Sequence, residues 1–276
     1  MQTGPIGVFD SGYGGLTVLK SLVRALPAYD FIYLGDNARA PYGTRSFETV
    51  YKYTKACVDW FFQQGCPLVI LACNTASAKA LRTIQQQDLS HYGPEKRVLG
   101  VIRPTAEIIG NYSQSGHIGI LATPGTVASN SYQLEIEKFF PAANVTQQSC
   151  PLWVPLIENN VHQTPGATFF IKSCVQKLLQ QDSQIDTVLL GCTHYPIIQN
   201  EIEVALPDHI KVVAQGDIVA DSLKDYLVRH PEMNALLHKT SRLSFFTTDD
   251  VADFNTHAPL FYGEPVKALY ADITTS

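Results

Sequence analysis

The chain has 276 residues, of which 45% are hydrophobic and 16% are charged, and its formal net charge at pH 7 is −5. That length can bury a sizeable core, as one large domain or two modest ones. The acidity comes without a basic stripe, an aromatic RNA-binding signature or zinc-finger spacing, which argues against nucleic acid as the primary partner. The longest apolar run, 67–73, is far too short to span a bilayer, so we expect no membrane partner.

The N-terminus and the cysteine content both bear on the compartment. The first ten residues contain no charged region followed by a long apolar one, so we expect no signal peptide. Six cysteines in such a chain are typical of thiols rather than of a disulfide framework. Together these features predict a cytoplasmic protein.

The chain opens with a predicted strand at residues 6–9, a glycine-rich loop at 10–15 and a helix-like stretch that runs through Leu26. The loop offers the Ser11 hydroxyl and backbone N–H groups at a helix start, an arrangement that favours anions. Gly-x-Gly-Gly is unspecific by itself, because a phosphate cradle or a simple tight connection has the same pattern.

Strand-like and helix-like stretches alternate along the rest of the chain. Further strands are expected at 31–34, 69–72, 98–102, 118–121, 145–149, 188–191, 211–213 and 243–247. Examples of the expected helices are 47–64, 77–87, 166–181 and 220–230. This alternation predicts an α/β fold of two similar doubly wound domains with parallel-rich sheets and helices on both faces.

Two similar nine-residue stretches are the most informative feature. Residues 69–77 read VILACNTAS and residues 188–196 read VLLGCTHYP. In each, large aliphatic residues end in a small residue, and a cysteine and polar side chains follow. The aliphatic run predicts a buried parallel strand, so each cysteine lies where a strand ends, at the sheet edge where α/β proteins bind ligands. A duplicated α/β unit explains the recurrence.

Two thiols at equivalent places predict one site approached from two sides. Moving a proton from one face of a carbon to the other needs two acid/base groups, because a single base mostly returns the same enantiomer. The pKa of free cysteine is about 8.5 and suitable surroundings lower it, so a thiol/thiolate pair can work near neutral pH. The alternative is that Cys73 and Cys192 are small buried hydrophobic residues, which their duplicated context disfavours.

Four motifs in order, at compatible spacings, resemble those of the glutamate racemases, the cofactor-independent, two-thiol branch of the aspartate/glutamate racemases. The motifs are Asp10-Ser11-Gly-x-Gly-Gly, Pro41-Tyr42-Gly43, Ala72-Cys73-Asn74-Thr75-Ala76 and Leu190-Gly191-Cys192-Thr193-His194-Tyr195-Pro196. The resemblance covers nearly the whole chain, down to residues 246–250. It implies interconversion of L-glutamate and D-glutamate, which supplies D-glutamate for bacterial peptidoglycan.

The resemblance also implies a domain organisation. Residues 1–97 and 210–276 would form the first domain, which carries Asp10, Tyr42 and Cys73. Residues 98–209 would form an inserted second domain, which carries Thr123, Cys192 and His194. The active site would lie in the cleft between the two domains.

Three residues are predicted to assist the thiols. The resemblance places Asp10, at the end of the first strand, beside Cys73 or the substrate ammonium group. His194 could orient or tune Cys192, since imidazole titrates near neutral pH. Glu158 matches a family position near the second thiol. The alternatives are a turn-capping aspartate, a locally bonded histidine and a solvated glutamate at a helix start.

Binding glutamate requires groups for two carboxylates and one ammonium. The predicted substrate-binding residues are Asp10, Ser11, Pro41, Tyr42, Gly43, Asn74, Thr75, Thr123, Thr193 and His194. Tyr42 alternatively contributes only its backbone, with its ring used for packing. The remaining cysteines lie outside any repeated motif and are interpreted as structural thiols: Cys57, Cys66, Cys150 and Cys174.

We expect no cofactor and no metal, because the sequence contains no nucleotide fingerprint, no lysine context for pyridoxal phosphate and no cluster at metal-ligand spacing. The predicted partners are L-glutamate and D-glutamate, and whether the chain forms a homodimer stays open. Three alternatives remain: an aspartate or broader-specificity racemase, a catalytically silent amino-acid-binding module, and a thiol hydrolase that uses His194 with one cysteine.

The stretch 100–105 departs from the family pattern. Arg103 and Thr105 stand where many members have an acid or small polar residue and a glycine. If this stretch is the crossover between the domains, Arg103 alters hinge contacts or a subunit or effector surface. The alternative, which we favour, is a solvated surface arginine.

Overall fold

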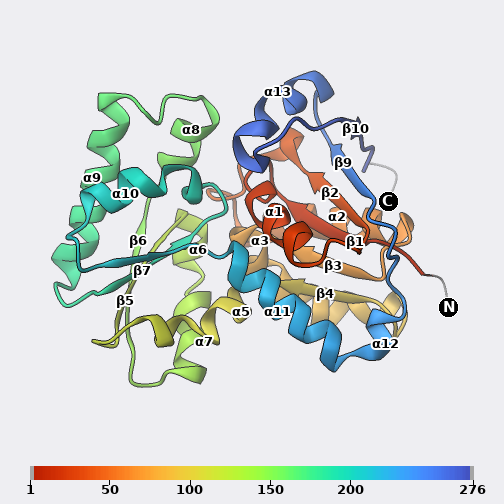
Figure 1. The fold of residues 1–276 in the computed structure, drawn as a ribbon, viewed down its shortest axis with the longest axis horizontal. Coiled ribbons are helices and arrows are strands. Elements are labelled where there is room, and N and C mark those ends of the chain that lie inside the picture. The colour runs from red at the N-terminus through yellow and green to blue at the C-terminus, as the bar shows by residue number, and fades with distance from the viewer. Residues whose placement is uncertain (1–2, 274–276) are drawn as a thin grey trace.

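The computed structural model describes residues 3–273, which form two β-sheets with helices packed around them (Figure 1). A six-stranded sheet has the order β10-β9-β2-β1-β3-β4 and a four-stranded sheet the order β6-β5-β7-β8. All neighbouring strands of these two sheets are parallel. The predicted α/β class with parallel sheets is therefore confirmed.

The six-stranded sheet forms the right half of Figure 1. Its strands are β1 (Ile6–Asp10), β2 (Phe31–Gly35), β3 (Leu68–Leu71), β4 (Arg97–Gly100), β9 (Leu243–Thr247) and β10 (Ala268–Tyr270). The helices of this half are α1 (Leu16–Ala25), α2 (Phe47–Gln63), α3 (Asn74–Lys79), α4 (Leu81–Thr83), α11 (Gly216–Arg229), α12 (Pro231–Asn234) and α13 (Val251–Tyr262). Strands β1 and β3 are buried along their whole length, as expected where helices cover both faces.

The four-stranded sheet forms the left half. Its strands are β5 (His117–Ala122), β6 (Asn144–Ser149), β7 (Thr187–Gly191) and β8 (Lys211–Val213). Its helices are α5 (Ile102–Ala106), α6 (Pro124–Ala128), α7 (Ser131–Phe139), α8 (Trp153–Glu158), α9 (Pro165–Gln181) and α10 (Gln199–Ala205). Short 3₁₀ or π turns complete the chain: η1 (Asn37–Arg39), η2 (Ile84–Asp88), η3 (Leu89–His91), η4 (Ile109–Tyr112) and η5 (Tyr195–Ile198).

The chain crosses between the sheets twice, after β4 and after β8. Strand β4 pairs with β3 in the larger sheet, and β8 pairs with β7 in the smaller one. The crossovers therefore follow residues 100 and 213, a few residues beyond the predicted boundaries at 97 and 209. The division into 1–97 plus 210–276 and 98–209 as folding units stays a prediction.

One expected helix is wrong. The stretch 77–87 is not a single helix but the end of α3, then α4 and the π-helical turn η2. Helix α3 begins earlier, at Asn74, because the Cys73 sulfur accepts a hydrogen bond from the Ala76 N–H and caps the first turn. It ends at Ala80, whose φ of −113° departs from helical geometry.

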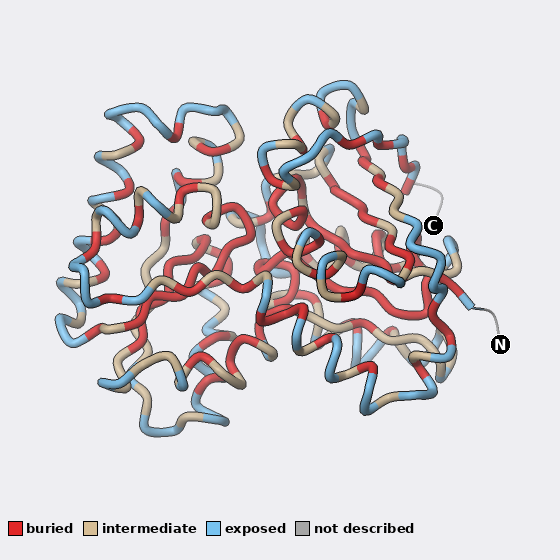
Figure 2. The backbone as a smooth tube through the Cα atoms, in the orientation of Figure 1, coloured by how far each residue is buried: buried red, intermediate tan, exposed pale blue. Residues whose placement is uncertain are grey.

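Burial is concentrated along the strands and where the two halves meet (Figure 2). One cluster of buried apolar side chains includes Leu16 and Tyr33 from one half and Leu190 and Cys192 from the other. The halves therefore share a continuous apolar core, so the contact between them is partly hydrophobic and not only polar.

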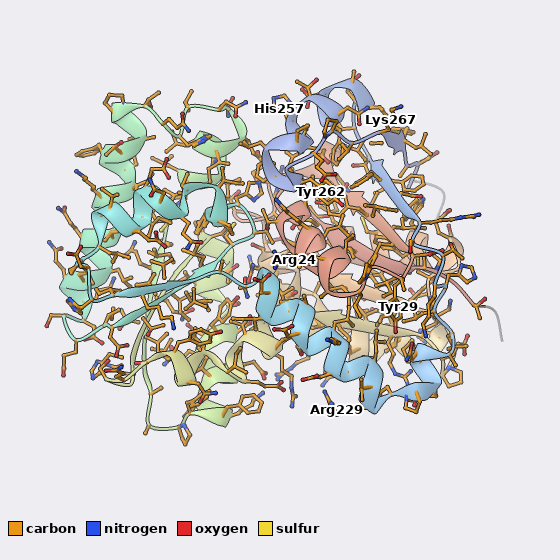
Figure 3. The ribbon with its side chains drawn as sticks, in the orientation of Figure 1. Arg24, Tyr29, Arg229, His257, Tyr262 and Lys267 are labelled. Atoms are coloured by element: carbon orange, nitrogen blue, oxygen red, sulfur yellow. The ribbon has the colours of Figure 1, made fainter. Side chains whose placement is uncertain are left out.

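Helices α1 and α11 pack side by side in the six-stranded half. Arg24, labelled in Figure 3, lies on α1 next to α11 and forms an ion pair with Asp217 at 2.5 Å. Both side chains are exposed, so the pair contributes little stability. The packing itself comes from apolar residues such as Leu19 and Leu223, which belong to the shared core. Within residues 3–273, no helix is long and apolar enough to cross a membrane.

Asp186 fastens the loop before β5 to the start of β7. Its carboxylate accepts hydrogen bonds from the Ser113 hydroxyl at 2.6 Å and from the N–H groups of Gln114 and Ser115 at 2.7 Å each. Burial alone would raise the pKa of Asp186, but these hydrogen bonds hold it well below its usual value. The ionised form therefore stabilises the folded state.

We expect Asp186→Asn to lower the free energy of unfolding by about 1.5–3 kcal/mol at pH 7, the range for hydrogen bonds to a charged group. Because the pKa is depressed on folding, the contribution is present above the unfolded value near 4 and is lost as the pH falls below it. Urea unfolding of both proteins should show a constant difference from pH 7 to 5 and a shrinking one below pH 4. A difference that does not change with pH contradicts the role of the charge.

Candidate active site

A single pocket between the two halves contains nearly all the predicted site residues. Its lining is Ser11, Ala40, Pro41, Tyr42, Gly43, Thr44, Cys73, Asn74, Thr75, Thr123, Pro124, Cys150, Pro151, Val154, Pro155, Glu158, Cys192, Thr193 and His194. Of the predicted residues, Asp10 alone lies outside this lining. Side chains separated by more than a hundred positions in the sequence therefore converge on one space.

The residues that line the pocket include several that directly follow the carboxyl ends of parallel strands. Ser11 follows β1 and Cys73 comes shortly after β3, while Thr123 follows β5 and Cys192 follows β7. All four are interior strands, with a neighbouring strand on each side. The carboxyl edges of parallel sheets are the usual ligand-binding edges, and here two such edges face the same pocket.

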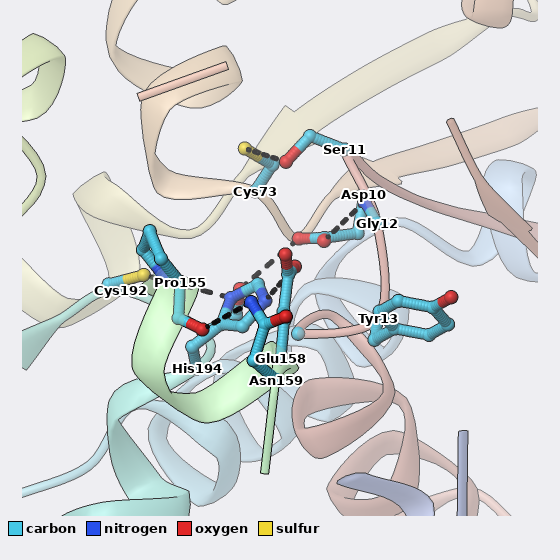
Figure 4. Close-up of polar contacts among 12 residues, drawn as sticks. Asp10, Ser11, Gly12, Tyr13, Cys73, Pro155, Glu158, Asn159, Cys192 and His194 are labelled. Atoms are coloured by element: carbon cyan, nitrogen blue, oxygen red, sulfur yellow. Dashed lines mark hydrogen bonds and ion pairs between the residues drawn. The ribbon is translucent and has the colours of Figure 1, made fainter. Parts of the chain in front are cut away.

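Cys73 lies in buried surroundings at the start of α3. Its sulfur is 3.5 Å from the Ser11 hydroxyl oxygen (Figure 4). The same sulfur accepts a hydrogen bond from the Ala76 N–H at 3.4 Å. Burial raises the pKa of the Cys73 thiol to about 12, and the nearby charge of Asp10 acts in the same direction. At neutral pH, Cys73 therefore holds its proton and is poised as a proton donor.

Cys192 has different surroundings, because it forms a chain of contacts with His194 and Glu158. Its sulfur is 3.9 Å from Nδ1 of His194, and Nε2 of that ring is 2.8 Å from Oε1 of Glu158 (Figure 4). Burial alone would lower the pKa of His194, but its hydrogen bonds to Cys192 and Glu158 raise it to about 10. The Cys192 sulfur thus lies next to a charged imidazole, whereas the Cys73 sulfur lies near the carboxyl group of Asp10.

Asp10 lies behind the pocket and links the two halves. Its carboxylate accepts hydrogen bonds from the Gly12 N–H at 3.0 Å and from the Thr193 hydroxyl at 3.3 Å. The side chain is completely buried, and burial raises its pKa. Asp10 therefore shapes the loop after β1 and holds the residue that follows Cys192, while its predicted contact with substrate stays a prediction.

The loop around Pro41-Tyr42-Gly43 is also tied across the boundary. The Gly125 N–H donates to the Gly43 carbonyl oxygen at 2.8 Å. A Cβ at Gly43 would lie 2.9 Å from the Cβ of Thr123, so only glycine permits this approach. The Tyr42 ring is buried and its hydroxyl donates to Asp36 outside the pocket lining, in keeping with a ring used for packing. The Ala40–Pro41 peptide bond is cis.

Two threonines complete the bridge between the halves. The hydroxyl oxygens of Thr75 and Thr123 are 2.9 Å apart. Thr123 also caps α6, since its hydroxyl accepts a hydrogen bond from the Thr126 N–H. The Thr75 hydroxyl is thus held at the pocket wall by Thr123, which is itself fixed at the start of α6.

The sequence interpretation missed part of the pocket wall. The additional lining residues are Ala40, Thr44, Pro124, Cys150, Pro151, Val154 and Pro155. Thr44 follows Gly43 and Pro124 follows Thr123 in the sequence, so their position next to predicted site residues could have identified them. The segment 150–155 follows β6 at the same sheet edge as Cys192, but it has no counterpart in the repeated stretches. Cys150, interpreted as a structural thiol, is buried and also lines the pocket.

Helix α13 supports His194 from outside the pocket. The ring of Phe261 meets the imidazole edge-on, with centroids 5.2 Å apart, and also stacks against Tyr13 at 5.8 Å. The Tyr13 hydroxyl donates to Asp253 at 2.6 Å, at the start of the same helix. The C-terminal helix thus helps to hold a side chain of the other half.

Arg103 lies on α5, away from the pocket lining. Its side chain is 66% exposed, pairs with Glu107 at 3.0 Å and lies 5.6 Å from the ring centre of Phe139. These contacts fit the alternative of a solvated surface arginine. An effect of Arg103 on subunit or effector contacts stays a prediction.

Comparisons with known proteins agree with this geometry. The Asp/Glu/Hydantoin racemase family matches residues 6–223 of the chain. The glutamate racemase of Dinoroseobacter shibae is 41% identical over 272 residues, which cover 95% of this chain and 97% of that protein. The similarity therefore includes both halves of the molecule and the pocket between them.

Solved structures show the same similarity. Glutamate racemase from Francisella tularensis, crystallised in complex with D-glutamate, has a TM-score of 0.87 at 32% identity, and the match covers 100% of both chains. A glutamate racemase isoform from Bacillus anthracis has a TM-score of 0.88 at 31% identity, covering 99% of this chain and 98% of that one. The two-sheet arrangement is thus that of known glutamate racemase structures.

We expect Glu158→Gln to lower the pKa of His194 from about 10, because the substitution removes a negative charge that stabilises the imidazolium. The measurement is an NMR titration of the ring Cε1–H, assigned by comparison with a His194→Gln variant. Glu232→Gln is the matched control, since it removes a surface carboxylate beside His230 and should leave His194 unchanged. An unshifted His194 titration in Glu158→Gln would show that Glu158 does not hold the charge.

Proposed function

The chain belongs to the Asp/Glu/Hydantoin racemase family, and we propose that it interconverts L-glutamate and D-glutamate by passing the Cα proton between Cys73 and Cys192. It is an amino-acid racemase, and hence an isomerase. One observation carries the proposed mechanism: two thiols from corresponding strand ends line a single pocket in opposite electrostatic surroundings.

In the proposed reaction, L-glutamate loses its Cα proton to the Cys192 thiolate. The electron pair of the C–H bond passes into the substrate, where the α-carboxylate shares the negative charge. The Cys73 thiol then delivers its proton to the opposite face of the carbon and becomes a thiolate. The D-glutamate reaction runs these steps in reverse, so each thiol is an acid in one direction and a base in the other.

The substrate is bound by polar groups on either side of the central carbon. The Ser11 loop and the amides around Tyr42-Gly43 take the distal carboxylate, as backbone N–H groups at a helix start favour anions. Neutral donors surround the central carbon, namely Asn74, Thr75, Thr123 and Thr193. Asp10 supports the ammonium end together with Thr193, to which it is hydrogen-bonded. The ammonium charge would in turn favour the thiolate form of each cysteine.

The proposed mechanism uses only side-chain and backbone groups of the chain itself and needs no cofactor or metal. All six cysteines are free thiols, which fits a reducing cytoplasm. There the D-glutamate product would serve peptidoglycan synthesis.

A circular dichroism assay tests the substrate. We expect L-glutamate and D-glutamate each to racemise without added cofactor, and L-aspartate to be a poor substrate. Aspartate is one methylene shorter, so its distal carboxylate would leave buried donors unpaired. Comparable turnover of aspartate would indicate a broad-specificity racemase. Loss of activity on metal chelation, or a requirement for pyridoxal phosphate, would contradict the cofactor-free mechanism.

Substitution of the thiols tests the mechanism. Cys73→Ser and Cys192→Ser should each reduce racemisation at least about 10²–10⁴-fold, because a hydroxyl is too weak a base at neutral pH. The losses should not multiply in the double variant, since either one already interrupts the proton path. Cys66→Ser, at a buried thiol outside the pocket lining, is the matched control and should remain active.

Isotope incorporation separates one base from two. In deuterated water, D-glutamate formed from L-glutamate should carry deuterium at Cα, while recovered L-glutamate stays largely unlabelled at early times. Equal early labelling of substrate and product would indicate a single base. Near-normal racemisation by either variant at Cys73 or Cys192 would also rule out the two-thiol mechanism.

A further inference from the structure

A buried ring of hydrogen bonds joins the pocket to both chain crossovers. Asn74, the residue after Cys73, lines the pocket and is 2% exposed. Gln215 lies between β8 and α11, at the second crossover, and is 4% exposed. Tyr132, on α7 of the other half, is completely buried. Three segments far apart in the sequence thus meet beside a pocket residue.

The three side chains form a closed cycle. Nδ2 of Asn74 donates to Oε1 of Gln215 at 2.8 Å. Nε2 of Gln215 donates to the hydroxyl oxygen of Tyr132 at 2.5 Å. The Tyr132 hydroxyl then donates to Oδ1 of Asn74 at 2.5 Å. Each member both donates and accepts, so no member can turn without breaking two bonds.

Residues at the first crossover determine which end of the Gln215 amide donates and which accepts. Nε2 of Gln215 also donates to the Thr105 hydroxyl oxygen at 2.9 Å and lies 3.4 Å from the Val101 carbonyl oxygen. The Thr105 hydroxyl uses its own hydrogen for that same carbonyl, at 2.9 Å, so it faces Gln215 as an acceptor. A carbonyl oxygen can only accept. The NH₂ end of Gln215 must therefore point to Val101 and Thr105, and its oxygen must point to Asn74.

This direction determines the orientation of the Asn74 amide. With the Gln215 oxygen facing it, Asn74 must present its NH₂ group to Gln215 and its oxygen to Tyr132. A reversed Asn74 would place its own oxygen against Oε1 of Gln215, two acceptors with no hydrogen between them. Since an amide NH₂ has two hydrogens and Gln215 takes one, the other is available to an acceptor in the pocket.

We propose that Gln215 is a positioning residue for substrate binding, which orients the Asn74 amide so that it donates to a substrate carboxylate. This inference rests on the proposed racemase function and deepens it. Gln215 and Tyr132 lie outside the pocket lining and act through Asn74. Because Val101 and Thr105 follow β4 and Gln215 follows β8, these hydrogen bonds also connect both crossovers to a residue that lines the pocket.

The test is a double-mutant cycle between Gln215→Leu and Asn74→Ala, read in kcat and KM for both glutamate enantiomers and in D-glutamate binding by calorimetry. Leucine keeps the approximate size but offers no hydrogen bond. We expect Gln215→Leu to raise KM and the dissociation constant about 10-fold, the effect of one misdirected hydrogen bond to a carboxylate, with a smaller change in kcat. In the Asn74→Ala background, Gln215→Leu should add little.

Two further variants keep the test decisive. Gln85→Leu is the matched control, since Gln85 also donates its amide to a backbone carbonyl of the β4 region, that of Val98, but lies outside the pocket. It should leave KM unchanged. Where Gln215→Leu does not fold, Tyr132→Phe breaks the same cycle by loss of one hydroxyl and should raise KM in the same way.

The outcomes are distinguishable. Losses that multiply in the double variant, or an unchanged KM in Gln215→Leu and Tyr132→Phe, would overturn the positioning role while wild-type turnover keeps the proposed function intact. A wild-type chain that neither binds nor racemises glutamate would overturn the proposed function itself, and the inference with it.

Discussion

The constraint on which the structure depends is that two parallel sheets present their carboxyl edges to the same space. Loops at those edges carry polar groups, and burial between the halves requires that each of these groups find a partner. In three pairs beside the pocket, the two partners come from opposite halves. These pairs are Thr193 with Asp10, Thr75 with Thr123, and Gly125 with Gly43. These hydrogen bonds hold the loops of the two halves together. Because the same loops carry Cys73 and Cys192, the hydrogen bonds also hold the two thiols in place relative to each other.

The electrostatic difference between the thiols follows from the same arrangement. Cys73 lies in buried surroundings near a carboxylate, which keeps its proton in place. Cys192 has a charged imidazole beside it, held by Glu158 on one side and by Phe261 on another. In the proposed mechanism, one sulfur atom gains a proton as the other loses one, so turnover in either direction leaves the number of protons on the two thiols unchanged. Each turnover leaves the proton on the other sulfur atom, so exchange with solvent restores the starting state before the next turnover in the same direction.

The sequence was sufficient for the elements whose signal is local. A run of aliphatic residues that ends in Ala-Cys or Gly-Cys predicts both the strand and the position of its cysteine, and the repeat shows that Cys73 and Cys192 are equivalent. The single helix expected over 77–87 was wrong, because capping by Cys73 and the break at Ala80 depend on local backbone geometry that no periodic pattern records.

The supporting residues could not be predicted in the same way. Gln215, Tyr132 and Phe261 belong to segments without a motif, and each acquires its importance only when a distant residue lies beside it. The wall at 150–155 is similar, since it reaches the pocket through the pairing of β6 with β5. Such contacts are properties of the tertiary structure. No local pattern in a single sequence indicates which distant residues will make these contacts.

The most direct measurement of the central claim is a crystal structure of this chain with D-glutamate bound in the pocket. We predict that the substrate Cα lies between the two sulfur atoms, with Cys73 on one face and Cys192 on the other, each at about 3–3.5 Å as expected for reacting atoms. A complex with both sulfur atoms on the same face of Cα, or with either one out of reach, would contradict the two-thiol mechanism.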